Sequence, residues 1–108
     1  MVNIRNKGKR GELEVAKIIN RVLGTNVRRT PNSGGLSIKG DIIDINIDSV
    51  IHDCHFEIKN HKNLVFGKWW EQAEGDCPLG KLPVLVFKHK GRWMAVQELH
   101  DWLNKIGE

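Results

Sequence analysis

With 108 residues, 40% of them hydrophobic and 28% charged, the chain is predicted to fold as one soluble domain, residues 1–108, with its own core. No apolar run is long enough to span a bilayer and no secretory signal precedes the domain, which excludes membrane and secreted classes. The two cysteines indicate a reducing, cytoplasmic setting. The net charge of +4 is uneven, because residues 1–30 carry eight basic and two acidic side chains and residues 31–60 carry two basic and five acidic ones.

The first predicted helix covers residues 11–23, where apolar residues recur every three or four positions and Gly24 follows as a C-terminal stop. Glu12 lies in line with this apolar stripe, whereas Glu14 lies on the charged side of the helix. Residues 1–10 form a basic arm, for which the alternative is a solvated, partly disordered terminus. Residues 27–30 form a short β-like run, and residues 31–35 form a loop.

Two strands are predicted next. Residues 41–48 alternate in polarity, with Asp41 on the same face as the isoleucines. After a turn, residues 50–60 form a second strand, whose apolar face carries Phe56 and Ile58. Glu57 and Lys59 lie on its opposite face together with Asp53 and His55. We expect Asp53 and His55 to face solvent, and contact with a second metal ion is the alternative.

Residues 67–76 are predicted to form a short helix, and residues 82–88 and 92–96 a hairpin around the turn Lys90-Gly91. Residues 97–106 close the chain as an amphipathic helix whose Trp102 is expected in the core, as is Trp93. The order α-β-β-β-α-β-β-α indicates an α/β fold with a mixed central sheet flanked by helices.

Three acidic residues occur where a soluble protein does not place them by chance. Glu12 lies on an inward helix stripe, Asp41 begins a strand on its apolar face, and Glu57 lies on the next strand two residues before Lys59. If the helix packs across the strands, the three carboxylates converge and repel each other unless a cation lies among them. Oxygen ligands suit Mg²⁺ or Mn²⁺ rather than zinc. The alternative is that each acid is an ordinary surface or capping residue.

A zinc site is not favoured. His52, Cys54, His55 and His61 lie close in sequence, but on a strand the first two point away from His55. There is no paired C-x-x-C motif to complete a tetrahedral site.

The order of these features resembles the PD-(D/E)XK nuclease motif. It consists of a helix glutamate, a basic strand, a Ser-Gly loop, a strand aspartate and a Glu-x-Lys strand. Within that superfamily the pattern is most similar to the Holliday-junction resolvases of archaea and phages, which adds Ser33 in the loop and Gln72 on the following helix. The likeness covers about the first three-quarters of the chain. It departs from the motif at Gly40, where the name has proline, and the shortness of the chain leaves little room for junction-binding elements.

This resemblance implies a restriction-endonuclease-like core and a Mg²⁺-dependent, structure-specific DNA endonuclease that hydrolyses phosphodiesters with a metal-activated water. It implies that Glu12, Asp41, Glu57 and the backbone carbonyl of Ile58 bind Mg²⁺, for which Mn²⁺ substitutes. Catalysis is then expected to involve the three acids with Lys59, and Gln72 and Ser33 to support the site. It further implies a homodimer that cuts paired strands of branched DNA during recombination.

Basic residues around this motif are candidates for contacts with DNA phosphates, which give affinity without sequence specificity. They are Arg5, Lys7, Lys9, Arg10, Arg28, Arg29, Lys39, Lys62 and Lys68. One of Trp69 and Trp70 is expected in the core or at a dimer surface, and stacking on an unpaired base is the alternative.

Two other functions remain open at this point. A nuclease of the same fold that acts on flaps, single strands or a specific duplex would share the site but differ in substrate. A non-catalytic DNA-binding module would keep the acids as solvated residues and would not respond to Mg²⁺.

Overall fold

We analysed a computed structural model, which describes residues 4–30, 41–44, 46 and 48–108. The elements are α1 (Ile4–Leu23), β1 (Arg28–Arg29), β2 (Ile42–Ile43), β3 (Cys54–Lys59), α2 (Phe66–Asp76), β4 (Leu82–His89), β5 (Arg92–Val96) and α3 (Leu99–Ile106). Their type and order are those predicted from the sequence. In the described parts of the chain, no helix has the length and apolar character needed to cross a membrane.

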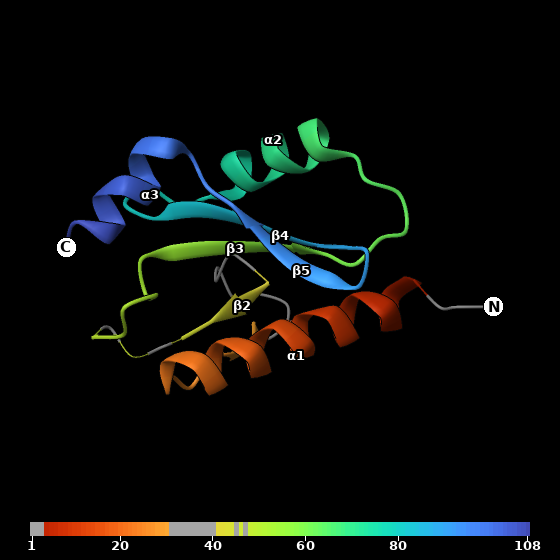
Figure 1. Ribbon diagram of the computed structural model, residues 1–108, viewed down its shortest axis with the longest axis horizontal. Coiled ribbons are helices and arrows are strands. Elements are labelled where there is room, and N and C mark those ends of the chain that lie inside the picture. The colour runs from red at the N-terminus through yellow and green to blue at the C-terminus, as the bar shows by residue number, and fades with distance from the viewer. Residues whose placement is uncertain (1–3, 31–40, 45, 47) are drawn as a thin grey trace.

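The fold is mixed α/β. Strands β3, β4 and β5 form a sheet in which β3 and β4 run parallel and β4 and β5 antiparallel. The short antiparallel pair of β1 and β2 adjoins β3, because the backbone N–H of Asp41 donates to the carbonyl of Phe56 at 2.9 Å. Helix α1 covers one side of the sheet and α2 the other (Figure 1). This mixed sheet between helices confirms the predicted fold class.

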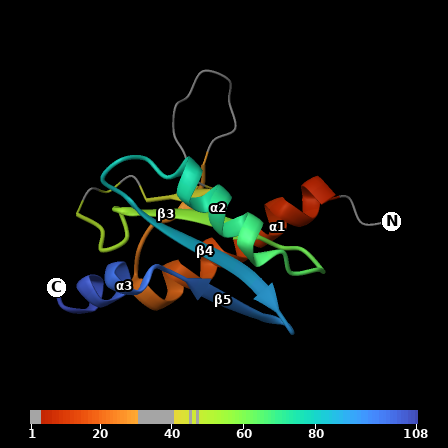
Figure 2. The same ribbon diagram turned by 90° about the horizontal axis from the view of Figure 1, so that it is seen from above.

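The main core lies between α1 and the sheet. It includes Val15 and Ala16 from α1 and alternate residues of β3 and β4, which face the helix because side chains alternate along a strand. The opposite face of the sheet carries Leu85, which is fully buried, beneath Trp69 and Ala73 of α2. The view from above places α2 over β3 and β4 (Figure 2).

Helix α1 begins at Ile4, seven residues before the predicted start, so residues 4–10 of the basic arm are the first part of a helix. The sequence hid this start because Gly8 and Gly11 are poor helix formers and lack apolar side chains. The predicted stop is confirmed, since Gly24 adopts a positive φ of 67° and its N–H bonds to the carbonyl of Asn20. The Asn20 side chain then holds both the N–H and the carbonyl of Val27, which fixes the entry into β1.

The predicted second strand is shorter than expected, because residues 48–53 form turns and β3 begins only at Cys54. Backbone bonds from His52 to Ser49 and from Cys54 to Ile51 close these turns. A strand was predicted over residues 41–48, and β2 covers only Ile42–Ile43 of this range. Residues 45 and 47 lie outside the described residues.

Two predictions about burial are wrong. His55 is 2% exposed rather than in solvent, because α2 covers the face of β3 from which it projects. Trp102 is 49% exposed rather than in the core. Trp93 is half-buried and packs against the core as expected, and of the two adjacent tryptophans Trp69 is the buried one.

Candidate active site

Asp41 is fixed against the middle of β3. Its backbone N–H bonds to the carbonyl of Phe56, and its Oδ2 accepts a bond of 2.6 Å from the N–H of Ile58. These two residues flank Glu57 in the sequence, so Asp41 is held directly beside Glu57. Glu57 itself is 6% exposed, on the face of the sheet that α2 covers. Two acidic groups, one just before β2 and one on β3, therefore meet here, with Glu57 buried and Asp41 half-buried.

The electrostatics of this pair are those of two carboxyl groups that share a proton. Burial, and after it the nearby charge of Asp41, raise the pKa of Glu57 to about 7, and Lys59 partly opposes this shift. Burial also raises the pKa of Asp41, although the bond from Ile58 opposes this. Because the two side chains hydrogen-bond to each other, the proton that Glu57 keeps near neutral pH is donated to Asp41. Without a cation, a proton stabilises the pair.

Lys59 and Gln72 form the next part of the site. The Nζ of Lys59 lies 3.8 Å from Oε2 of Glu57 and donates a bond of 2.7 Å to Oε1 of Gln72. Gln72 reaches Lys59 because its neighbours on α2, Trp69 and Ala73, are buried against the sheet. The lysine therefore has a fixed position beside the carboxyl pair.

Glu12 is near this pair but is bonded elsewhere. Its charge contributes to the raised pKa of Asp41, yet its Oε2 accepts a bond of 2.7 Å from Nε of Arg29. In the described part of the chain, no three His, Cys, Asp or Glu side chains lie together as they would around a metal ion. The structure thus brings Asp41 and Glu57 into contact and places Glu12 beside them with a basic partner.

Gly11 and Asn60, to which the sequence interpretation gave no packing role, bring α1 close to β3. Gly11 is buried, and a Cβ there would lie 2.9 Å from Cβ of Asn60 and 3.2 Å from the ring of Trp93. Asn60 also donates a bond to the backbone carbonyl of Lys7 at 3.0 Å. Gly11 immediately precedes Glu12, so this close approach sets the position of the acid. A glycine next to a candidate metal ligand on a helix is the sequence signal that could have indicated this close approach.

The chain was compared with known proteins. The family model described as "Phage putative PDDEXK endonuclease" matches residues 3–105. Protein D14 of Escherichia phage T5 is 33% identical over 119 aligned residues, which cover 93% of this chain and 74% of that protein. No solved structure matches. The chain belongs to the PD-(D/E)XK nuclease superfamily. Its family is a phage family, and nucleases of this superfamily use divalent metal ions and act on DNA.

The donor set of this PD-(D/E)XK site fits a hard divalent cation. Two carboxyl groups in contact, Glu57 buried and Asp41 half-buried, offer oxygen ligands, and the proton that they share near neutral pH occupies a place that a cation of higher charge would fill more favourably. Neither Cys54 nor Cys77 takes part, since Cys77 lies after α2 and burial raises the pKa of the Cys54 thiol to about 11. The chemistry of these residues therefore suits Mg²⁺ or Mn²⁺.

The other predicted residues fall into two groups. Lys7, Lys9 and Arg10 lie on the first half of α1, Arg28 lies on β1, and Lys62 and Lys68 flank the start of α2. Arg29, also predicted to contact phosphate, donates a hydrogen bond from its Nε to Glu12. Ser33, Lys39 and the side chain of Arg5 lie outside the described residues.

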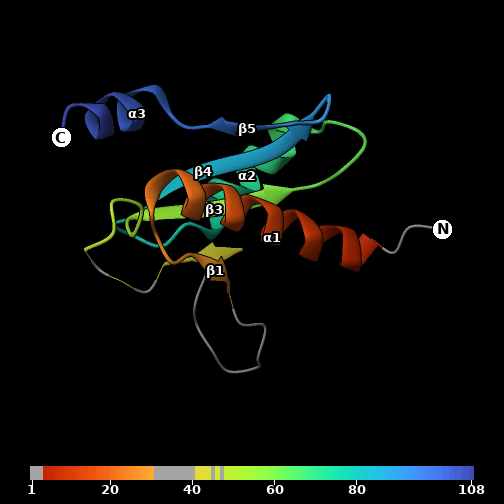
Figure 3. The ribbon, with the colours of Figure 1, turned by 60° about the horizontal axis from the view of Figure 1, so that its bottom comes forward.

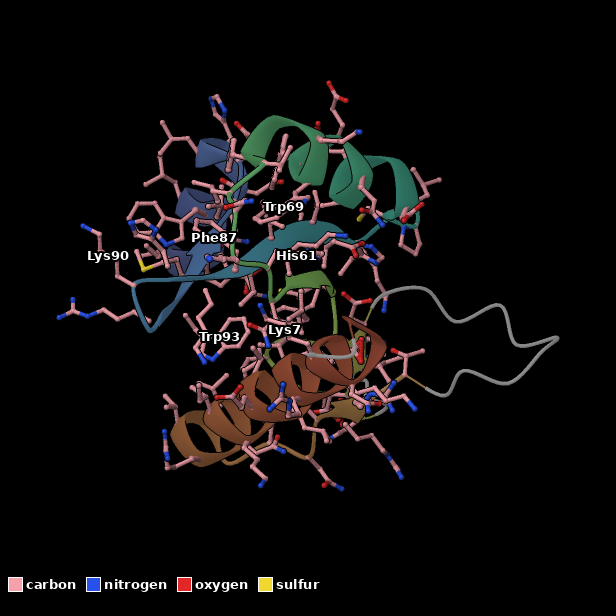
Figure 4. All side chains as sticks on the ribbon, turned by 90° about the vertical axis from the view of Figure 1, so that its right-hand side faces the viewer. Lys7, His61, Trp69, Phe87, Lys90 and Trp93 are labelled. Atoms are coloured by element: carbon pink, nitrogen blue, oxygen red, sulfur yellow. The ribbon has the colours of Figure 1, made fainter. Side chains whose placement is uncertain are left out.

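The aromatic side chain of Trp69 packs α2 against the sheet next to the site. The Trp69 ring lies 6.2 Å from that of Phe87 and 5.5 Å from that of His61, measured between centroids. Figure 4 shows these three rings together between α2 and the sheet, while Trp93 lies toward α1. Trp69 therefore anchors α2 to the sheet.

Proposed function

We propose that this protein is a Mg²⁺-dependent, structure-specific DNA endonuclease that acts on branched DNA as a homodimer in the cytoplasm of a phage-infected cell. The observation that carries the proposal is the contact between half-buried Asp41 and buried Glu57, with the ammonium group of Lys59 at 3.8 Å from the Glu57 carboxylate. Two acids and a lysine in this arrangement are suited to hydrolysis of a phosphodiester, in which water forms one P–O bond as the ester P–O bond breaks.

Asp41, Glu57, Glu12 and the backbone carbonyl of Ile58 are the proposed metal ligands. When bound, Mg²⁺ supplies Lewis acidity to the scissile phosphate and to the attacking water. Asp41 is already fixed for this role by its bonds to the backbone of β3. Glu12 would take part by exchanging its bond with Arg29 for the ion, which would leave Arg29 available to a DNA phosphate.

Lys59 is the proposed catalytic cation. Its Nζ is oriented by Gln72, so that it can donate hydrogen bonds to a phosphate oxygen as negative charge develops there. Its distance from Glu57 also allows it to orient a water molecule shared with that carboxylate. Ser33, which follows β1 and precedes β2 in the sequence, is proposed to support the site.

The basic surface of α1 provides the proposed contacts with the DNA backbone. Lys9 and Arg10 are exposed, and both precede Glu12 on the same helix. Lys62 and Lys68 lie on the other side of the site, before and within α2. Such contacts recognise phosphates rather than bases, which favours a substrate defined by its shape.

The test is cleavage of a labelled four-way junction with and without Mg²⁺, beside flap, nicked, single-stranded and linear duplex DNA. We expect Mg²⁺-dependent cutting with a preference for the junction. Asp41→Asn and Glu57→Gln should lower the rate by about 10³-fold or more, as expected when ligands of a catalytic metal are lost. Both should keep DNA binding, because removal of negative charge does not weaken contact with phosphates.

Matched controls are Asp48→Asn and Glu71→Gln, which change exposed carboxylates away from the pair and should cut normally. Full activity of both site variants would refute the proposed mechanism. A preference for flaps or linear duplex would keep the nuclease and reject the junction as its substrate. Absence of cutting on every substrate, with no Mg²⁺-dependent rise in Tm, would favour a DNA-binding module.

A further inference from the structure

Helix α3 presents its apolar side to solvent. Leu99, Trp102, Leu103 and Ile106 recur at the spacing of one helix face, and between 49% and 62% of each side chain is exposed. No residue of this eight-residue helix is buried. A helix this short is marginal in water unless its apolar face is packed. The face therefore lacks the contact that would normally stabilise it.

The polar side of α3 faces the domain instead. Lys105 is half-buried and pairs with Asp53, just before β3, at 2.6 Å. On a helical projection Lys105 lies about 160° from Leu103 and about 100° from Ile106, and about 60° from Trp102, which is the least exposed of the four apolar residues. This ion pair holds the helix so that the apolar side points away from the sheet.

Strand β5 continues the same surface. It is the outer strand of its sheet and hydrogen-bonds only to β4, so one edge of its backbone is open within the described residues. Met94 and Ala95 are exposed, and a groove of about 370 Å³ lies where β5 leads into α3. The groove is lined by Ala95, Val96, Gln97, Leu99 and Trp102. Figure 3 shows β5 and α3 along one side of the molecule, away from β1.

The charges along this edge are complementary to those of the same edge in a second copy. Lys90 and Arg92 are exposed at the start of β5, and Glu98 and Asp101 follow its end. Two copies related by a two-fold axis would run antiparallel, and each basic start would then lie beside an acidic end. The same partner would therefore hydrogen-bond to the open edge of β5, cover the apolar side of α3 and pair with the charges at both ends of the edge.

We propose that β5 and α3 form the interface of a two-fold dimer of this chain, with β5 pairing antiparallel with β5 of the second copy. Pairing of Arg92 with Glu98 of the other copy sets the register, and it places Ala95 opposite Ala95. The carboxylate of Glu98 is already fixed there, since it caps α3 by accepting from the N–H of Asp101 at 3.1 Å. The small side chain of Ala95 allows close approach at the axis. The apolar faces of the two α3 helices would be buried at either end.

This arrangement would also place the two proposed active sites, which lie on β3, on the same face of one continuous sheet. Five strand spacings separate β3 from its copy, which is about 24 Å. This is close to the width of a DNA duplex, so the spacing suits cutting of two strands in one complex. That consequence rests on the proposed nuclease function, whereas the interface itself does not.

The test is the oligomeric state of the purified full chain without DNA, measured by sedimentation equilibrium from about 1 to 100 μM. We expect a dimer for the wild type and at least a tenfold weaker association for Leu103→Glu, which places a charge in the interface. The matched control is Leu79→Glu, which makes the same change at a leucine that is fully exposed in a loop, and it should associate like the wild type. A monomeric wild type at 100 μM, or equal association by Leu103→Glu and wild type, would overturn the proposal.

A second measurement tests the register of the two strands, and it remains valid if Leu103→Glu fails to fold. Ala95→Cys should form a disulfide between two copies on mild oxidation, because opposed residues on antiparallel strands lie within reach of an S–S bond. The wild type, whose Cys54 and Cys77 are only partly exposed, should not cross-link, and neither should Leu79→Cys. Failure of Ala95→Cys to cross-link in a sample that sediments as a dimer would refute the strand pairing. These results do not depend on cleavage, so a failed interface and a failed nuclease function are distinguishable.

Discussion

The carboxyl pair beside β3 and the outer edge formed by β5 and α3 depart from ordinary burial in opposite ways. At the first, Glu57 is 6% exposed and shares a proton with Asp41, so polar groups are buried where they destabilise the metal-free protein. At the second, large apolar side chains are half-exposed on a helix that has no buried residue. Each departure is unfavourable for the isolated chain. A bound cation would relieve the first, and a protein surface would relieve the second.

The largest expected effect concerns the first region. Replacing Lys59 by methionine removes the ammonium group and keeps a side chain of similar length beside Glu57. We expect kcat for cleavage to fall about 10²–10⁴-fold with little change in KM, because the lysine acts on charge that develops during the reaction. Lys17→Met, on the exposed side of α1, is the control. A loss confined to KM would show that Lys59 only binds DNA.

The contrast between the two regions can be measured directly with their tryptophans. Trp69 is 8% exposed beneath α2, so Trp69→Ala should lower the free energy of unfolding by about 3–5 kcal/mol. Trp102→Ala should change it by no more than about 0.5 kcal/mol when the protein is dilute enough to be monomeric. Urea unfolding below 1 μM gives both values. Similar losses for the two variants would mean that α3 packs on its own domain.

The sequence predicted the polar region better than the apolar one. Alternation along β3 placed Glu57 and Lys59 on one face, and one of the two adjacent tryptophans of α2 was expected in the core or at a dimer surface. Alternation did not reveal that the second face of β3 is also covered, which is why His55 was placed in solvent. The bond between Glu12 and Arg29 joins residues 17 positions apart, and no local pattern signals it.

The error at α3 has a more general cause. The spacing of Leu99, Trp102 and Leu103 predicts a helix with one apolar side, and that helix is present. Periodicity shows that a helix has an apolar side, but it does not show what that side contacts. Trp102 was assigned to the core because the apolar side was assumed to pack against its own domain. The contact between Lys105 and Asp53 determines the orientation, and it links residues 52 positions apart.

A smaller effect should follow from the shared proton. The pKa of Glu57 is raised from 4.5 to about 7 in the folded protein, so the native state binds more protons than the unfolded state between these pH values. Stability of the metal-free protein should therefore fall as the pH rises through this window, by about 3 kcal/mol. Glu57→Gln should flatten this dependence, whereas Glu71→Gln should not. Thermal unfolding from pH 4.5 to 8 in EDTA measures it, and equal slopes for wild type and Glu57→Gln would contradict the shared proton.

The same pair gives an independent test of cation binding. At pH 8, where the proton is lost, added Mg²⁺ should raise the Tm of the wild type, because an ion that binds only the folded state stabilises it. The rise should be much smaller for Glu57→Gln. An equal rise for both proteins would place the ion elsewhere.

The smallest predicted effect compares two glycines of α1, and it tests how the helix is held against β3. Alanine is the better helix former, so Gly8→Ala, where a Cβ would meet no atom within 4 Å, should stabilise the protein by about 0.5–1 kcal/mol. At Gly11 the same gain is opposed by contacts of 2.9 Å with Asn60 and 3.2 Å with Trp93, so Gly11→Ala should destabilise it by about 1 kcal/mol. Because Glu12 follows Gly11, this variant should also cut DNA more slowly, whereas Gly8→Ala should not. Equal gains in urea unfolding for both variants would mean that α1 can move away from β3 without loss, and that the position of Glu12 is not set by this contact.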